Sequence, residues 1–323
     1  MHDRSVGTSG LRVSALALGS WLTYGGPSVQ QRSAIEIVRR AYDLGINYFD
    51  TADMYQLGGA EELLRVALDG IPRESVVLAT KAFWPVGPGP NDRGLSRKHL
   101  FESVNRSLRR LGTDYVDMFF FHRFDPEVPL EETLSTLDML VKAGKVLYVG
   151  VSEWAAPQIE RALGLEAQYG WDPIRVSQPC YNMLNRSIER DVLATCDRAG
   201  IGQVVWSPLA EGFLTGKYKE GAPLPEGSRA ADSRLASAIS NYMTPRNYER
   251  VKELEALANE AGMPLARLAL AWILRLPSVA SAITGASRLE QLEANVLAAD
   301  IILPDDLLKA IDSVLDDPDP KDV

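Results

Sequence analysis

The sequence contains none of the common motifs for nucleotide binding in an open sheet, zinc-dependent hydrolysis or serine hydrolysis. Its 323 residues include no GxGxxG after a strand-like run, no HExxH and no GxSxG. Doubly wound nucleotide-binding sheets normally carry the glycine-rich turn, and zinc proteases and α/β-hydrolases depend on the other two motifs. These absences argue against all three classes and predict no metal site.

Cysteine, excess positive charge and long apolar runs are also scarce. Cys180 and Cys196 have neither CxxC nor metal-ligand spacing, which favours a reducing cytoplasm over a disulfide-rich exterior. The net charge of -9 and the pI near 5.0 disfavour nucleic acid and acidic membranes as partners. The apolar run "VSALALGSWL" is short and interrupted for a signal peptide, and no segment approaches the roughly 20 apolar residues of a membrane span.

Short apolar runs alternate with helical patterns along the whole chain. In residues 32–44, for example, Ala34, Val38 and Ala41 have helical spacing before a stop at Gly45. Strand-like runs occupy residues 15–20, 47–52, 75–81, 114–122, 145–152, 174–182, 202–209 and 279–286. Most are continuously apolar, which indicates strands buried on both faces of a parallel sheet.

Eight such units predict a (β/α)8 barrel, and we expect residues 1–323 to form one domain. A doubly wound open sheet is the alternative, although the missing glycine-rich turn disfavours it. Residues 7–10, Gly-Thr-Ser-Gly, predict a hairpin that closes the lower mouth of the barrel. The long segment 210–247, before helical patterns at 248–261 and 264–276, predicts a functional cover.

Ionisable side chains gather at the ends of three consecutive predicted strands. Asp50 ends the second strand, with Tyr55 in the loop beyond it, while Lys81 ends the third and His122 the fourth. Each residue alone is more often structural, but the carboxyl ends of barrel strands share one mouth. An ammonium paired with a carboxylate can stabilise a phenolate, so Lys81 and Asp50 could make Tyr55 a proton donor. His122 could bind an oxygen on which charge develops, and a proton donor without a nucleophile suits carbonyl reduction by a hydride-carrying cofactor.

With these residues in place, the sequence resembles the aldo-keto reductases over nearly its whole length. "FDTADMYQLGGAEELLRVAL" is similar to the family's second-strand signature, and "LATK", "DYVDMFFFH", "GKVLYVGVSEW", "SQPCYN" and "WSPLAEGFLTGKY" follow in the family's order. Within the family, these motifs are most similar to those of the branch that contains potassium-channel β subunits and bacterial relatives. The resemblance implies a barrel that binds NADP(H) across its mouth, with Asp50, Tyr55, Lys81 and His122 as the catalytic residues.

The resemblance also implies a cofactor-binding set. Trp206 would stack on the nicotinamide, while Ser152 and Gln178 would bind its carboxamide. The pyrophosphate would follow Ser207, Leu209, Gly212, Lys217 and Arg229, and the adenosine end would meet Gly285, Ser287, Gln291 and Asn295. Ser20, Trp21, Pro208 and Arg288 complete the set.

Two residues of this set also carry a physical argument. Ser287 stands where a helix N-cap is expected, and a helix N-terminus attracts phosphate. Arg288 adds a cation that could pair with a 2′-phosphate, which favours NADP over NAD. A solvated surface position for Arg288 is the alternative.

Two positions, Glu153 and Ala294, differ from the family pattern, and His122 differs only from the channel β subunits. Glu153 replaces the Asn of many members and the Arg of channel subunits, and a carboxylate cannot donate as an amide does. Ala294 stands where Glu is common beside the adenine. His122 matches the reductases, whereas channel β subunits have Asn, which favours catalysis.

We therefore expect an NADPH-dependent reductase of a small-molecule aldehyde or ketone. A nucleotide-sensing regulatory subunit with slow residual activity is the main alternative, and a barrel isomerase using Asp50 and Lys81 is a weaker one. Aromatic residues after the first three strands predict a pocket for an aromatic or medium-sized aldehyde: Trp21, Tyr24, Tyr55, Phe83 and Trp84. The family branch implies homo-oligomers of four or eight subunits, although no oligomer surface is visible in the sequence.

Overall fold

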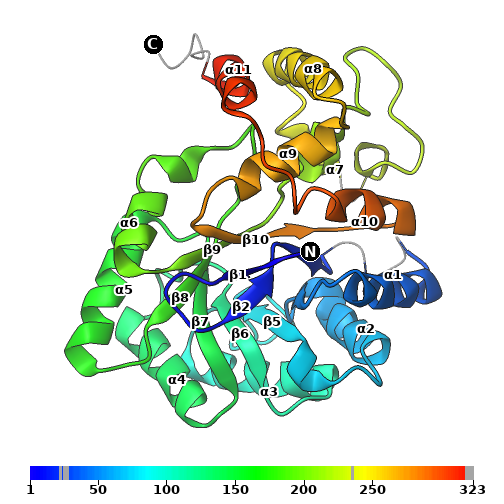
Figure 1. The fold of residues 1–323 in the computed structure, drawn as a ribbon. Coiled ribbons are helices and arrows are strands. Elements are labelled where there is room, and N and C mark those ends of the chain that lie inside the picture. Colours follow the sequence, from blue (N-terminus) through cyan, green and yellow to red (C-terminus); the bar gives the residue numbers. More distant parts are fainter. Residues whose placement is uncertain (22–23, 25–28, 234–235, 317–323) are drawn as a thin grey trace.

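The computed structural model describes residues 1–21, 24, 29–233 and 236–316, and its centre is a closed barrel of parallel strands. Each strand pairs with the next along the chain, and the last closes on the first (Figure 1). The barrel strands are β3 (Leu16–Gly19), β4 (Tyr48–Asp50), β5 (Val77–Ala82), β6 (Val116–Phe121), β7 (Val146–Ser152), β8 (Ile174–Gln178), β9 (Gly202–Val205) and β10 (Val279–Thr284). The predicted (β/α)8 fold is confirmed.

Helices surround this barrel and bury the outer faces of its strands (Figure 1). They are α1 (Gln31–Asp43), α2 (Gly59–Ala67), α3 (Arg97–Leu111), α4 (Leu130–Lys142), α5 (Ala156–Tyr169), α6 (Val192–Ala199), α7 (Ala236–Ser240), α8 (Pro245–Glu260), α9 (Leu265–Leu274), α10 (Leu289–Val296) and α11 (Asp305–Leu315). Ser96 caps α3 as its sequence suggests, because its side chain accepts a hydrogen bond from the His99 amide. No helix in the described ranges is long and apolar enough to cross a membrane.

The predicted N-terminal hairpin lies across one end of the barrel (Figure 1). Its strands, β1 (Asp3–Ser5) and β2 (Arg12–Ser14), pair in antiparallel fashion. Val6 and Val13 pack on the apolar side chains of the barrel interior. The amide of Thr8 donates to the carbonyl of Gly200, just before β9 begins. The hairpin therefore closes the end at which the strands start, and the opposite end is left for a site.

Two strands end earlier than their apolar runs predict. β8 stops at Gln178 because Pro179 follows and cannot donate to a strand ladder, and β9 stops at Val205, two residues before Ser207 takes a positive φ of 52°. Beyond the ends of β8 and β9, a single bridge between Cys180 and Trp206 continues their pairing. The residues after both strands thus become loops at the open mouth.

The long segment before β10 contains short helices rather than one continuous cover. It includes η4 (Ala210–Thr215), η5 (Arg229–Ala231) and α7, with residues 234–235 outside the described chain. Its end returns to the barrel, where the hydroxyl of Tyr242 accepts a hydrogen bond from Asn182 Nδ2 at 3.1 Å. Its role as a functional cover stays a prediction.

Candidate active site

The open end of the barrel brings the four residues of the predicted catalytic group together. Asp50 is the last residue of β4, Lys81 lies one residue before the end of β5, and His122 follows β6 directly. Tyr55 begins the short helix η1 (Tyr55–Gly58) after β4. All four side chains are at least nine-tenths buried. Parallel strands with a common direction therefore explain why residues 72 positions apart in sequence meet at one mouth.

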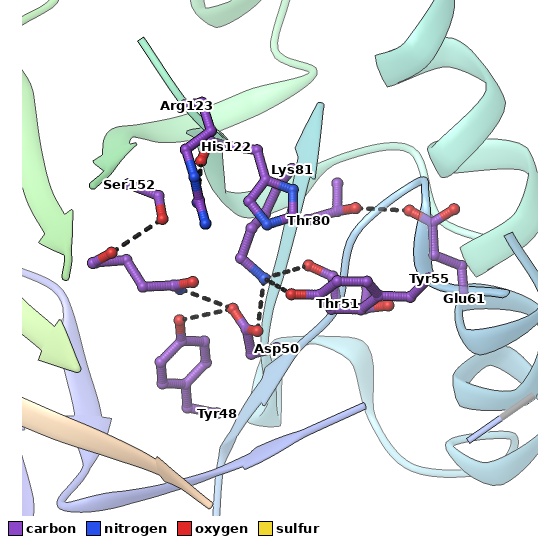
Figure 2. Close-up of polar contacts among 11 residues, drawn as sticks. Tyr48, Asp50, Thr51, Tyr55, Glu61, Thr80, Lys81, His122, Arg123 and Ser152 are labelled. Atoms are coloured by element: carbon purple, nitrogen blue, oxygen red, sulfur yellow. Dashed lines mark hydrogen bonds and ion pairs between the residues drawn. The ribbon is translucent and has the colours of Figure 1, made fainter. Parts of the chain in front are cut away.

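Lys81 is the centre of this group. Its fully buried Nζ donates to Asp50 Oδ2 at 2.6 Å, to the carbonyl of Thr51 at 2.7 Å and to the Tyr55 hydroxyl at 3.3 Å (Figure 2). A buried ammonium is costly unless it is paired and hydrogen-bonded. Asp50 supplies the opposite charge, and the three acceptors fix the direction of the amine. The lysine is thus held charged beside the phenol.

The charges in this group act on Tyr55 in opposite directions. Burial raises the pKa of the Tyr55 hydroxyl above its usual range, and the Lys81 ammonium offsets only part of this rise. In the chain alone, desolvation of the phenolate outweighs its attraction to Lys81, and the role of Tyr55 as proton donor stays a prediction. Burial would by itself lower the pKa of Lys81, but Asp50 and Tyr55 raise it above its usual value.

Two polar residues hold Asp50 from the side opposite Lys81. Gln178 Nε2 donates to Asp50 Oδ1 at 2.9 Å, and the Tyr48 hydroxyl donates to the same oxygen at 3.4 Å. The family resemblance implies that Gln178 binds the cofactor, which stays a prediction, and in the structure its amide binds Asp50. It missed Tyr48, although residues two apart on a strand face the same side and could have indicated it. Ser152, also expected at the cofactor, donates from Oγ to the Gln178 carbonyl at 2.9 Å.

His122 forms one wall of the mouth together with aromatic rings. Its ring centre lies 5.8 Å from that of Tyr55 and 6.4 Å from that of Trp84, in both cases edge to face. Burial, followed by the nearby charges of Lys81 and Arg123, lowers the pKa of His122 well below its usual range. The imidazole is therefore neutral at neutral pH and can donate one hydrogen bond. Its Nδ1 has no partner in the described parts of the chain.

The predicted aromatic pocket is only partly present. Phe83 and Trp84 contact each other edge to face, and both are partly buried beside His122. Trp21 contacts Trp206 in the same manner, with ring centres 6.3 Å apart. Tyr24 is fully buried instead and donates to the carbonyl of Ala286, so it packs in the core and does not line the mouth.

Behind Tyr55 and Lys81 lies a buried ion pair that sequence reasoning missed. The Glu61 carboxylate accepts hydrogen bonds from Thr80 Oγ1 and from Arg110 Nε, both at 2.6 Å. Thr80 precedes Lys81 on β5, and the Arg110 side chain covers Gly58, at the end of η1. The spacing of Glu61 and Arg110 on separate helices gives no signal for this pairing in sequence.

Glu153, one of the departures from the family pattern, fixes the tryptophan expected at the nicotinamide. Glu153 Oε1 accepts from the indole Nε1 of Trp206 at 2.9 Å and from the Cys180 amide at 2.5 Å. Glu153 has a φ of +58°, an uncommon conformation for a side chain of its type. The carboxylate therefore orients the Trp206 ring, which stays partly exposed, in place of donating to a ligand.

A second carboxylate, that of Glu211, binds two residues that are expected at the pyrophosphate, Ser207 and Arg229. Ser207 Oγ donates to Glu211 Oε1 at 2.8 Å and accepts from the Glu211 amide at 3.1 Å. Glu211 also forms an ion pair with Arg229 on η5. Ser207, Ala210 and Glu211 all have positive φ values, so this loop turns sharply after β9. The sequence contains no pattern that indicates the Glu211 contacts.

The remaining cofactor candidates lie on the loops after β9 and β10, which are adjacent strands. Pro208, Leu209 and Gly212 belong to the first loop, and exposed Lys217 follows it with Nζ 5.1 Å from the Tyr218 ring centre. The loop after β10 and helix α10 carry the adenosine candidates: Gly285, Ser287, Arg288, Gln291 and Asn295. Gly285, Ser287 and Arg288 are exposed, whereas Asn295 is buried.

The expectation that Ser287 caps α10 is wrong. The cap residue is Arg288, in extended conformation and without a side-chain capping bond. Ser287 instead donates to Gln291 Oε1 from its amide at 3.0 Å and from its hydroxyl at 3.1 Å. Gln291 therefore reaches back to the residue that precedes the cap, and the first turn of α10 has no side-chain cap.

The mouth offers groups that fit a nicotinamide cofactor. Ser20 Oγ, directly after β3, is buried without a hydrogen-bond partner in the described segments. Such a hydroxyl is normally satisfied, so it fits a polar ligand atom. The partly exposed Trp206 ring provides a flat apolar face, and exposed Lys217 and Arg288 provide positive charge for phosphates.

Comparisons with known proteins match nearly the whole chain to one family. The aldo/keto reductase family model matches residues 15–316. A Schizosaccharomyces pombe protein assigned by name to the voltage-gated potassium channel β subunits is 41% identical over 321 residues, which cover 97% of this chain and 92% of the relative. An Arabidopsis thaliana protein of the same assignment is 41% identical over 305 residues, with coverages of 94% and 92%. L-glyceraldehyde 3-phosphate reductase of Escherichia coli K12 is 38% identical over 305 residues, with coverages of 92% and 87%.

The match extends from β3, through all the strand ends that carry the buried lysine and its partners, to the last helix. The family generally uses a nicotinamide cofactor, in keeping with the donors at the mouth. The chain belongs to the aldo/keto reductase family of oxidoreductases.

Proposed function

We propose that this protein reduces an aldehyde or ketone to an alcohol with NADPH, with Tyr55 as the proton donor. The observation that carries the proposal is the three-way contact of Lys81 Nζ with Asp50, Thr51 and the Tyr55 hydroxyl. This contact places a proton-bearing oxygen beside a fixed cation in a buried mouth. Relatives named as reductases support the same reaction type.

Each residue of the group has a distinct role in this proposal. The Tyr55 hydroxyl gives its proton to the carbonyl oxygen as charge develops there. Lys81 stabilises the phenolate that remains, and Asp50 keeps Lys81 charged and directed at Tyr55. Neutral His122 donates a hydrogen bond that orients the same oxygen. Bound NADPH would supply the hydride, which the protein side chains themselves cannot provide.

The cofactor would lie across the mouth between the β3 end and the α10 end. Trp206 would stack on the nicotinamide, and Ser20 would bind its polar edge. Gln178 and Ser152 would bind the carboxamide of the nicotinamide while keeping their present hydrogen bonds, from Gln178 to Asp50 and from Ser152 to the Gln178 carbonyl. Lys217, Arg229 and Arg288 would meet the phosphates, and Arg288 would favour NADPH over NADH.

The decisive experiment follows NADPH and NADH consumption with a panel of aldehydes and ketones, for the purified chain and for Tyr55→Phe. Loss of the general acid is expected to lower kcat by about 10²–10⁴-fold. Tyr169→Phe is the matched control, because Tyr169 is exposed at the end of α5. Full activity of Tyr55→Phe would contradict the assigned proton donor.

A regulatory, nucleotide-sensing subunit is the second candidate, favoured by the similarity to proteins assigned to channel β subunits. It predicts tight NADPH binding and turnover far below about 1 per second even with good aldehydes. We also propose homo-oligomers of four or eight subunits in the cytoplasm. Mass measurement in solution tests the oligomer independently of catalysis.

A further inference from the structure

Arg123 lies at the mouth beside the proposed catalytic residues and has no role in the proton transfer. It follows His122 directly, and Nη1 donates to the His122 carbonyl at 2.6 Å. Its guanidinium carbon lies 5.5 Å from the ring centre of Trp84, on the wall of the mouth. Figure 2 shows Arg123 beside His122 and near Lys81. The side chain is partly buried, so it is held at the rim of the site.

The positive charge of Arg123 is not neutralised within the described chain. No described carboxylate lies within 4.0 Å of its guanidinium, although many other arginines at this level of burial are paired, such as Arg73 with Asp117. The nearby acid Asp125 is occupied, because it accepts from the amides of Leu95 at 2.8 Å and Glu127 at 3.0 Å. A partly buried guanidinium with free donors is well suited to an incoming anion.

The charge also reaches the reacting groups. The Arg123 charge lowers the pKa of both Tyr55 and His122. Burial has the larger effect on each group: it raises the pKa of Tyr55 and lowers that of His122. An anion held at Arg123 would therefore lie in the same low-dielectric mouth as the proton donor. The Trp84 ring, which contacts both His122 and Arg123, would supply an apolar surface for the carbon skeleton of the substrate.

We propose that Arg123 binds an oxyanion of the substrate, a carboxylate or a phosphate, so that the enzyme prefers acidic aldehydes or ketones to neutral ones. The proposal rests on the proposed reductase function and adds a substrate class to it. Arg123 would hold the anionic end while His122 and Tyr55 hold the carbonyl end.

The test compares wild type with Arg123→Gln on two pairs of aldehydes that differ in charge. One pair is 4-carboxybenzaldehyde and methyl 4-formylbenzoate, and the other is glycolaldehyde phosphate and glycolaldehyde. The charged-to-neutral ratio of kcat/KM is expected to fall roughly tenfold or more in one pair, since a charge-assisted hydrogen bond is lost. The pair that responds identifies the carboxylate or the phosphate as the source of the anion. An unchanged ratio in both pairs would overturn the proposal.

Two further variants separate binding from a structural effect. Arg123→Lys keeps the charge and should retain part of the preference. Arg93→Gln removes an exposed arginine, paired with Glu127, and should keep the wild-type ratio. If Arg123 only supported the His122 carbonyl, charged and neutral aldehydes would lose activity equally, which would contradict the proposal.

An equilibrium measurement distinguishes this proposal from the reductase function. Calorimetric titration with 4-(hydroxymethyl)benzoate and with inorganic phosphate needs no turnover. If wild type reduces none of the aldehydes, the reductase function fails, whereas binding of either anion by wild type and not by Arg123→Gln still supports the anion site. Equal binding, or no binding, by both proteins would refute it.

Discussion

The Nε of Arg110 on α3 donates to the carboxylate of Glu61 on α2 at 2.6 Å, and Glu61 is completely buried. The pair joins two helices behind the strand end that carries Lys81. Thr80 Oγ1 also donates to Glu61, so the carboxylate links β5 to both helices. A carboxylate in this position can be tolerated only while its partners remain.

Arg110→Met should therefore destabilise the protein strongly. Removal of one member of a buried pair leaves the other charge uncompensated, at a cost of about 3–5 kcal/mol. Urea unfolding would measure the change in the free energy of unfolding, with Arg109→Met on the exposed side of α3 as control. A change below about 1 kcal/mol, as for an exposed pair, would contradict the structural role.

Asp53 should make stability depend on pH. Burial raises the pKa of Asp53 to about 7, although Ser103 Oγ donates to Oδ2 at 2.6 Å. Between the unfolded pKa near 4 and the folded value, the folded chain holds a proton that the unfolded chain has released. This contribution to stability is present below pH 4 and is lost as pH rises to about 7, by roughly 1.4 kcal/mol per unit for one proton.

Asp53→Asn should remove this dependence, because asparagine does not titrate. The slope of the unfolding free energy between pH 4 and 7 would become less negative, whatever the absolute stability of the variant. Asp114→Asn, at an exposed position, should keep the wild-type slope. Equal slopes for wild type and Asp53→Asn would show that Asp53 is ionised in the folded chain.

Glu211→Gln should tighten NADPH binding. Glu211 holds both Ser207 and Arg229, and its charge repels the pyrophosphate that these residues are proposed to meet. Removal of one negative charge at this range should lower the Kd about tenfold, as measured by quenching of tryptophan fluorescence. Glu226→Gln, at an exposed position of the same segment, should leave the Kd unchanged. Weaker binding by Glu211→Gln would mean that Glu211 holds the loop in shape for the cofactor and does not compete with the pyrophosphate for Ser207 and Arg229.

Glu153→Ala should loosen the Trp206 ring. The variant loses the acceptor for the indole Nε1 and for the Cys180 amide. Nicotinamide stacking would then cost more ordering entropy, so the Kd for NADPH should rise roughly tenfold. Glu153→Gln keeps one acceptor oxygen and should bind NADPH more tightly than Glu153→Ala. Equal affinity of the two variants would exclude a positioning role.

The sequence predicts the barrel well because its signals are periodic. The continuous apolar strands and the hairpin glycines each depend on nearby residues and agree with the structure. The strand order also explains why Asp50, Lys81 and His122 converge. Strand lengths are less predictable, because Pro179 ends β8 and the turn at Ser207 follows β9 inside runs that read as continuous strands.

Contacts between distant polar residues could not be predicted. Gln178 on Asp50, Glu211 on Arg229 and Glu61 on Arg110 depend on side-chain direction after the barrel closes. The net shift of the Tyr55 pKa could not be predicted either, because a charge partner is visible in the sequence whereas the degree of desolvation is not.

The N-terminal hairpin sets an order of events during synthesis. Its residues leave the ribosome before the barrel strands do, yet Thr8 hydrogen-bonds Gly200, and Arg4 Nη1 donates to the carbonyl of Val279 at 2.7 Å. Those acceptors are made only when most of the chain has already emerged. The hairpin must therefore wait for the last barrel strand, so the end of the barrel opposite the catalytic mouth is closed only after all the barrel strands have been synthesised.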